Sequence, residues 1–275
     1  MAHRASAAER EFALPPFGEH LVTTTHPLQL LVRKLQTHSP LSDADGAAIL
    51  GLHYTLKTYE PQGYIVREGD SPIVTGVLVS GFAFRQKLTG DGSRQIVAIH
   101  VPGDPLDFQN LYLDESDHNV QALTRSEIAV ISRADVQELA LERPGIGRAI
   151  SVLGLIESSI FREWILNVGR RAAPARIAHV LCELAMRLEA QGLADRYGYQ
   201  LPMTQEQLAD VVGLTPVHVN RTLKALEAHG LIKRDKRRVS FPDWQALRDV
   251  GDFNSRYLHL TAEEAPRYNS GTNLG

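Results

Sequence analysis

Between residues 54 and 133 the hydrophobic positions come in short runs, separated at nearly regular intervals by turn-forming residues. Glycine and aspartate mark many of these turns, because glycine tolerates positive φ and aspartate side chains close tight turns. Short β-rich runs at regular spacing predict an antiparallel sandwich or barrel. The expected strands are residues 64–66, 73–87, 94–101, 119–124 and 128–132, with a hairpin turn at residues 90–92.

From Pro144 onward the apolar period changes to that of a long helix. An apolar seam repeats every three or four residues over about three heptads, which predicts a helix that packs along one face. It consists of Ala149, Leu153, Ile156, Ile160, Trp164 and Asn167. We expect Leu153, Ile156, Ile160 and Trp164 to pair with the same helix of a second copy. Packing of the helix on the chain's own barrel is the alternative.

A break at residues 169–174 separates this helix from a second amphipathic helix. Arg170, Arg171 and Pro174 interrupt the apolar pattern there, so we expect an interdomain hinge. The second helix continues toward Gly192, and Cys182 falls on its apolar face. Packing is therefore the favoured role of this thiol, with redox sensing as the alternative.

Residues 203–231 carry the marks of two short helices joined by a tight turn at Gly213. Thr204 with Gln207 forms a capping-box pattern, and Thr215 followed by Pro216 is a typical helix start. Two short helices with such a turn predict a helix-turn-helix. A solvated helical hairpin with ordinary surface charges is the alternative.

The second of these helices and the segment after it carry polar and basic side chains. The exposed face of the helix holds residues of the kinds that contact bases and phosphates in a major groove, namely Val217, His218, Asn220, Arg221 and Lys224. After Gly230, residues 231–234 and 238–241 flank Asp235-Lys236-Arg237, which indicates a two-stranded basic wing.

Charge and composition exclude several classes of protein and of binding site. The 275-residue chain has a formal net charge of −3, yet residues 201–241 hold seven basic and four acidic side chains, which suits a polyanionic partner. No apolar run is long enough for a membrane span or a signal peptide, so we expect a cytoplasmic protein of two modest domains that does not enter a membrane. Cys182 is the only cysteine, which excludes an internal disulfide, a cysteine-held iron–sulfur cluster and a cysteine-rich zinc site within one chain.

Taken together, these motifs resemble the Crp/Fnr family of transcription regulators over about residues 28–260. The matching segments are Gly69-Asp70, Val79-Ser80-Gly81, the hairpin at 90–92, Pro102-Gly103-Asp104, the long helix, Arg176-Ile177-Ala178, residues 204–209 and residues 220–223. The resemblance implies an α+β fold with an N-terminal antiparallel β-roll like a cyclic-nucleotide-binding jelly roll, a long dimerisation helix and a C-terminal winged helix-turn-helix. It also implies that an effector in the roll changes how two DNA-reading helices are presented.

On this basis the chain divides into five parts. We expect a flexible arm at 1–25, a β-roll effector domain at 26–143, a dimerisation helix at 144–169, a winged helix-turn-helix domain at 170–260 and a flexible tail at 261–275. The expected partners are double-stranded DNA, a second copy of the chain and a small-molecule effector, with RNA polymerase as a further one.

The resemblance assigns DNA contacts residue by residue. It implies that Pro216, Val217, Asn220 and Arg221 read bases, and that Thr204, Thr215 and His218 hold phosphates. The basic side chains Lys224, Lys233, Lys236 and Arg237 are further candidates for phosphate contacts. Arg221 matches the family's guanine-contacting arginine, a common specific contact. Val217 replaces the family's usual glutamate, so we expect a different preferred half-site.

The effector segment departs from the cyclic-nucleotide-binding members of the family. Where those carry a Gly-Glu pair, this chain reads from Gly103 to Asn110, and their later Arg-Ser or Arg-Thr pair falls at about Ser116-Asp117. An aspartate in place of a phosphate contact repels the ligand, and no arginine follows before Arg125. We therefore expect a small effector other than cyclic AMP in a pocket formed by Leu106, Asp107, Phe108, Ser116, Asp117 and Phe161. A cyclic-nucleotide-responsive regulator and a constitutive DNA binder with an empty roll are the alternatives.

No catalytic or metal-binding pattern is present in the expected roll. Residues 60–132 contain no His-x-His, and Val79-Ser80-Gly81 lacks the first glycine of a nucleophile elbow, so we do not expect an enzyme or a metal site. His100 and His118 are the best placed of eleven histidines for haem, but ordinary polar roles are favoured for both.

Overall fold

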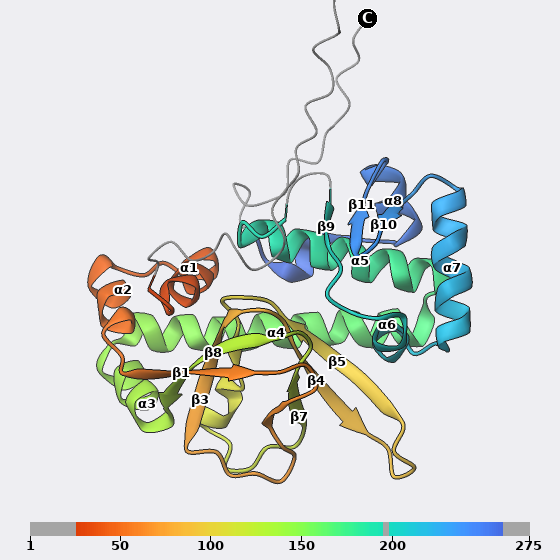
Figure 1. Ribbon diagram of the computed structural model, residues 1–275. Coiled ribbons are helices and arrows are strands. Elements are labelled where there is room, and N and C mark those ends of the chain that lie inside the picture. Colours follow the sequence, from red (N-terminus) through yellow and green to blue (C-terminus); the bar gives the residue numbers. More distant parts are fainter. Residues whose placement is uncertain (1–25, 195–197, 261–275) are drawn as a thin grey trace, which may run out of the picture.

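The computed structural model describes residues 26–194 and 198–260. The arm expected at 1–25 and the tail expected at 261–275 lie outside these described residues. Figure 1 shows a β-roll at one end of the molecule, a long helix across its face and a helical domain with a small sheet beyond that helix.

The roll consists of two four-stranded antiparallel sheets, as the regular β-rich runs predicted. One sheet has the order β1-β8-β3-β6, and the other has the order β2-β7-β4-β5. The strands are β1 (Tyr54–Tyr59), β2 (Tyr64–Val66), β3 (Val74–Ser80), β4 (Ala83–Leu88), β5 (Arg94–His100), β6 (Pro105–Leu106), β7 (Asn119–Ala122) and β8 (Ser126–Ser132). A short 3₁₀ helix, η1 (Phe108–Leu111), follows β6.

The single run expected at residues 73–87 is two strands in the structure. Gly81 separates β3 from β4 with φ +80°, and a Cβ at this position would collide with the Arg125 carbonyl. Strand β1 and the helices α1 (Gln29–His38), α2 (Asp43–Leu50) and α3 (Arg133–Glu142) had no prediction. Four consecutive residues of the edge strand β1 are exposed, so it lacks the alternation that marks a half-buried strand.

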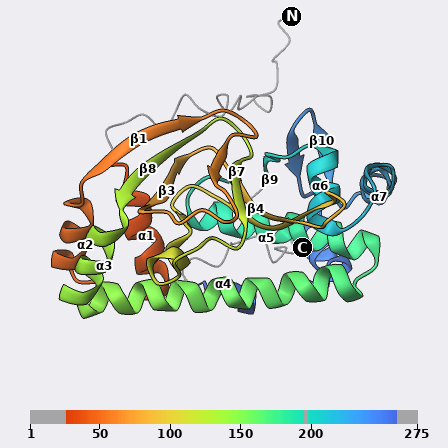
Figure 2. The same cartoon turned by 90° about the horizontal axis from the view of Figure 1, so that it is seen from below.

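The long helix α4 (Pro144–Arg170) passes along the roll and under the C-terminal domain (Figure 2). Its inner side packs on the chain itself, and Leu153, Ile156 and Trp164 are only 5–7% exposed. Ile160 is partly buried and packs against the core that contains Trp164. The seam that was expected to face a second copy therefore packs within one chain, because the roll, α1 and α5 cover that side of the helix.

The C-terminal domain combines four helices with a three-stranded sheet. The helices are α5 (Ala173–Ala190), α6 (Gln205–Val212), α7 (Pro216–Ala228) and α8 (Trp244–Val250), and a 3₁₀ turn, η2 (Ser255–Leu258), follows them. The expected wing is β10 (Lys233–Asp235) with β11 (Arg238–Ser240), to which β9 (Gly198–Gln200) adds a third strand. The α+β architecture inferred from the sequence is confirmed by these elements and their order.

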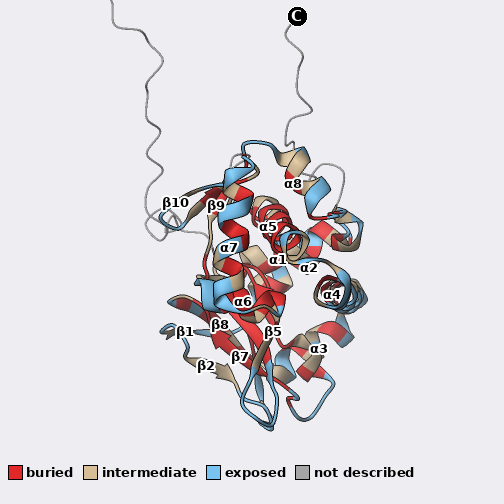
Figure 3. Cartoon of the chain, turned by 90° about the vertical axis from the view of Figure 1, so that its right-hand side faces the viewer, coloured by how far each residue is buried: buried red, intermediate tan, exposed pale blue. Residues whose placement is uncertain are grey.

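Helix α5 is the centre of this domain. Every residue from 177 to 188 is buried, and Figure 3 shows the helix enclosed by its neighbours. Cys182 lies fully inside, and burial raises the pKa of its thiol far above the ordinary value, as expected for a packing role. Within residues 26–194 and 198–260, no helix combines the length and the apolar character needed to cross a membrane.

Candidate DNA-binding face and effector cavity

Both helices of the helix-turn-helix begin where their capping residues predict, and α6 ends at its predicted turn. The Thr204 hydroxyl accepts a hydrogen bond from the Gln207 backbone N–H, and the Gln207 side chain accepts one from the Thr204 N–H. The Thr215 hydroxyl likewise accepts from the His218 N–H, with Pro216 in the first turn of α7. Gly213 ends α6 with φ +63°, a conformation that glycine adopts without a Cβ penalty.

The expected base-reading residues share one outer face of α7. Pro216, Val217 and Arg221 are exposed, and the Val217 side chain is notable for an apolar group at 81% exposure. Asn220 is half-buried, and its Nδ2 donates to Oε1 of Gln205 at 2.8 Å. Gln205 therefore belongs to this face, although no sequence signal had marked it beyond its place next to Thr204.

The expected phosphate-binding residues fall into two groups. Thr204, Lys236 and Arg237 meet around a hollow of about 210 Å³ between the start of α6 and the wing. Thr215, Lys224 and Lys233 are exposed and His218 is half-buried, outside that hollow. The wing is tied to α7 by Arg234, whose Nη2 lies 2.5 Å from Glu227, and this hydrogen bond lowers the pKa of the Glu227 carboxyl.

The helix-turn-helix also rests on the roll. Arg94 of β5 forms an ion pair with Asp210 of α6 at 2.6 Å. The Gln95 amide donates to the Asp210 and Val211 carbonyls at 2.7 and 3.1 Å, and so satisfies acceptors that the end of α6 leaves open. These contacts fix the direction in which α7 points relative to the roll.

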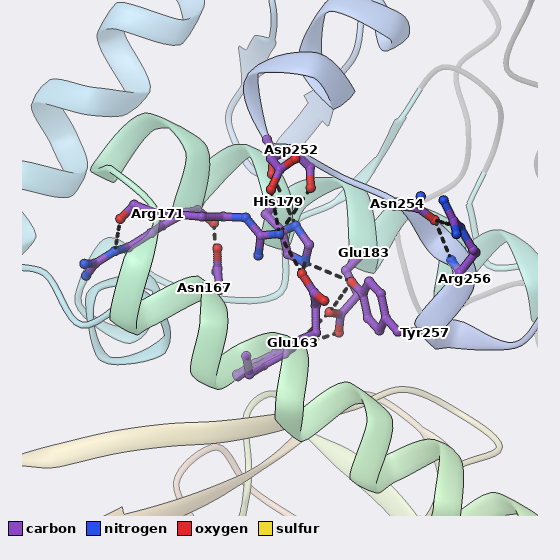
Figure 4. Close-up of polar contacts among 12 residues, drawn as sticks. Glu163, Asn167, Arg171, His179, Glu183, Asp252, Asn254, Arg256 and Tyr257 are labelled. Carbon is purple, nitrogen blue, oxygen red and sulfur yellow. Dashed lines mark hydrogen bonds and ion pairs between the residues drawn. The ribbon is translucent and has the colours of Figure 1, made fainter.

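A buried polar network joins α4, α5 and the C-terminal turn (Figure 4). Oε2 of Glu183 accepts from Trp164 Nε1 at 2.9 Å and from the Tyr257 hydroxyl at 2.8 Å. Arg187, one turn further along α5, reaches both Glu183 and Asp104 of the roll. Charged residues four apart inside an otherwise apolar helix were the available sequence signal for this network.

A cavity of about 410 Å³ lies between β4, β5 and the second half of α4. Its polar lining includes Arg85, Lys87, Gln95, Gln109, Asp117 and His118. Its apolar lining consists of Ile96, Val97, Phe161, Trp164, Ile165 and Val168. A site of this size and mixed lining suits a small organic molecule.

Two of the six residues expected in the effector pocket, Asp117 and Phe161, line this cavity. Phe108 and Phe161 line a second hollow of about 300 Å³ against α4. Leu106 packs in the roll core, and Ser116 is buried and accepts a hydrogen bond from Asn110. The expectation for Leu106 and Ser116 is corrected accordingly, because both side chains complete the interior of the roll.

Asp107 lies at the edge of this cavity in a cluster of buried charges. Its Oδ1 accepts from Arg85 Nη2 at 3.0 Å and from His118 Nε2 at 2.7 Å, and His118 Nδ1 faces Asp117 at 2.6 Å. Burial alone would raise the pKa of Asp107, but the His118 hydrogen bond and the Arg85 charge outweigh it and lower that pKa.

The expectation that no arginine lies near this segment was wrong, because β4 brings Arg85 from 22 residues upstream. The sequence signal that could have revealed this contact was the charged residue Arg85 inside the strand expected at residues 73–87. His118 is part of the charge cluster, and His100 is buried, with its pKa lowered to about 3 mainly by that burial. In the ranges 26–194 and 198–260, no three histidine, cysteine or acidic side chains are grouped as metal ligands.

Each half of the chain matches a domain of known proteins. Residues 56–143 match the model of the cyclic nucleotide-binding domain, and residues 175–250 match that of the Crp-like helix-turn-helix domain. The transcriptional activator FnrL of Cereibacter sphaeroides is 29% identical over 76% of this chain and 86% of its own length. The nitrogen fixation regulation protein FixK of Rhizobium meliloti is 31% identical over 70% of this chain and 85% of its own length. The structure of FixK2 from Bradyrhizobium japonicum superposes with a TM-score of 0.67 and 25% identity, over 72% of this chain and 98% of that protein.

Proposed function

Since the chain belongs to the Crp/Fnr family of DNA-binding transcription regulators, we propose that two copies of it bind a near-palindromic duplex, each with α7 in the major groove. Family membership makes the chain a regulator and not an enzyme, in agreement with the lack of a catalytic pattern. The observation that carries the proposal is the outer face of α7, where Val217 and Arg221 are exposed and Asn220 is held by Gln205.

The chemistry of that face supports base reading. An arginine donates two parallel hydrogen bonds to a guanine edge, and an apolar side chain contacts a thymine methyl group. Arg221 and Val217 are therefore the side chains proposed to choose bases, with Pro216 and Asn220 beside them. Thr204, Lys236 and Arg237, around the hollow next to the wing, are proposed to hold the phosphate backbone.

The proposed dimer uses the outer side of α4. The inner side is occupied, whereas Leu155 and Leu166 are 69% and 44% exposed on the outer side. Ile165, which also lines the cavity of about 410 Å³, is 70% exposed. Such an apolar stripe on a long helix favours pairing with a second copy. A two-fold dimer of this kind would place the two half-sites about 34 Å apart.

The effector proposed for the cavity of about 410 Å³ is a small molecule other than cyclic AMP. The apolar lining and the charges already present at Asp107 and Asp117 support this choice. We further propose a cytoplasmic location, where a bacterial regulator meets DNA, and RNA polymerase as a further partner, since the relative FnrL is named a transcriptional activator.

The first test selects a duplex from random oligonucleotides and measures its binding by fluorescence anisotropy. Arg221→Ala should weaken binding by about 1–3 kcal/mol and relax the preference at one base pair. Arg125→Ala is the matched control, because Arg125 is an exposed arginine of the roll that pairs only with the equally exposed Glu60. Equal affinity of Arg221→Ala and the parent for the selected duplex would refute α7 as the reading helix.

The same assay separates phosphate contacts from base contacts. Lys236→Ala should weaken all duplexes alike and reduce the slope of log K against log salt by about 1. Saturating cyclic AMP should leave the affinity of the parent for the duplex unchanged. A large gain in this affinity on adding cyclic AMP would show a cyclic-nucleotide sensor. The same affinity with every cavity ligand tried would favour constitutive binding.

A further inference from the structure

Asp107 holds an unusual backbone conformation at the edge of the effector cavity. It precedes η1 with φ 61° and ψ 43°, and only 2% of the residue is exposed. A residue with a Cβ adopts this left-handed region at a cost in free energy, which surrounding contacts must offset.

Those contacts come from an arginine and a histidine that converge on one oxygen. Arg85 Nη2 and His118 Nε2 both reach Oδ1 of Asp107, and all three side chains are only 3–4% exposed. Without the carboxylate, the buried Arg85 guanidinium would lose the partner of its charge, and His118 Nε2 would lose its hydrogen-bond partner, which is strongly unfavourable. This part of the roll is thus built around an anion.

Arg85 connects this charge cluster to the cavity. One edge of its guanidinium bonds Asp107, whereas Nε and Nη1 are buried without a hydrogen-bond partner among the described residues. Arg85 lines the cavity, 5.7 Å from the centre of the Phe161 ring. A molecule in the cavity would therefore lie beside a guanidinium whose positive charge is already balanced by Asp107.

We propose that the Asp107 carboxylate is a built-in anion, which fills the position that an anionic ligand would take beside Arg85 and His118. It leaves the cavity to an uncharged, mainly apolar molecule. The description of this molecule as an effector rests on the proposed function. The built-in anion itself does not, because its test below involves no DNA.

The test vacates the anion position and offers a small anion in solution. Asp107→Gly removes the carboxylate and also suits positive φ, so the backbone need not change. The thermal unfolding of this variant is measured in sodium formate and in a control solution of formamide with sodium gluconate at the same ionic strength. Formamide matches formate in shape but carries no charge, and gluconate is too large for the site. Formate should raise the Tm of Asp107→Gly by about 3 °C relative to formamide. The parent should show no such difference, because its site is filled.

Two control variants separate charge from backbone effects. Asp107→Asn keeps the side-chain volume without the charge, so it should be less stable than the parent and should not respond to formate. Gln62→Gly removes a side chain at φ 69° in an exposed turn of the roll, and it should also show no formate effect. If Asp107→Gly does not fold by itself, refolding in formate against formamide is the same test.

The proposal is overturned if the Tm of Asp107→Gly is the same in formate and in formamide. It is equally overturned if formate raises the Tm of the parent as much as that of this variant. It is also overturned if Asp107→Asn matches the parent in stability. A failure of DNA binding in the anisotropy assay would refute the proposed function and leave these outcomes unaffected.

Discussion

His179 is a fully buried histidine on α5, and its surroundings keep it neutral. Tyr257 and the Gly251 carbonyl lie 3.0 and 3.3 Å from its ring nitrogens, and the ring stacks on that of Tyr257 (Figure 4). Burial, followed by the charge of Arg171, lowers its pKa from 6.5 to about 4. A single residue thus makes the stability of the whole domain sensitive to acid.

We expect the parent to lose stability as the pH falls from about 6.5 toward 4. In this range the unfolded chain binds a proton at His179 that the folded chain excludes, which costs up to about 3 kcal/mol. Urea unfolding at pH 7.5 and 5 measures the loss. His179→Asn should be less stable at pH 7.5 and should show a smaller loss between the two values.

His53→Asn is the control, because His53 is exposed in the loop before β1 and its replacement should leave the pH dependence intact. His100, whose pKa is also lowered, remains in both proteins, so subtraction isolates His179. Identical acid-side losses in the parent and in His179→Asn would contradict the assignment.

At the scale of elements, α4 shows how one helix serves two surfaces. Its first half packs into a core with the roll and α1, whereas Trp164 belongs to a second core that contains residues of the roll and of the C-terminal domain. Trp164 also donates to Glu183 of α5. Its outer residues include Gly154 and Ser158 next to Leu155, which leaves room for the close approach of another helix. The outer side is therefore the surface on which dimer formation can be tested without disturbing the core.

Leu155→Glu should shift the protein from a dimer to the 30.4 kDa monomer in sedimentation equilibrium. Burying an unpaired carboxylate in the interface should raise the dimer dissociation constant by at least about tenfold. Leu141→Glu is the matched control, since Leu141 is an 83% exposed leucine of α3. A dimer of unchanged strength in Leu155→Glu would rule out this side of α4 as the interface.

At the scale of the whole molecule, Arg187 links the roll to the DNA-binding domain. Its Nη2 bonds Asp104 at 2.9 Å and the Ile99 carbonyl at 2.7 Å, and its Nη1 lies 3.3 Å from Glu183. Lys34 of α1 completes the site at 2.8 Å from Asp104. Burial opposes the charge on Asp104, but Lys34 and Arg187 outweigh it and hold the pKa of that carboxyl far below its ordinary value.

Replacing Arg187 with methionine keeps the unbranched apolar part of the side chain and removes the charged guanidinium. Because Asp104 and Glu183 stay buried, Arg187→Met should lower the free energy of unfolding by about 3–5 kcal/mol, as measured in urea. Arg125→Ala breaks the exposed pair with Glu60 and should cost less than about 1 kcal/mol. Equal stabilities of the two variants would mean that Arg187 does not hold the domains together.

The sequence alone determined the features that depend on neighbours in the chain. Thr204, Gln207, Gly213 and Thr215 mark both ends of α6 and the start of α7, because capping bonds and the left-handed turn join residues only a few positions apart. The regular turns of the roll and the helical periodicity of α4 are likewise patterns of residues close together in the chain. These signals were sufficient for the fold class and for the DNA-binding family.

Only the tertiary structure decided which faces meet. The apolar seam of α4 was visible in the sequence, but periodicity describes a face and not its partner, so packing on the chain itself had to be seen. The same holds for Arg85 and Asp107, which are 22 residues apart, and for Arg187 and Asp104, which are 83 apart. Pairing of buried charges depends on where strands and helices are brought together, and no local pattern along the chain carries that information.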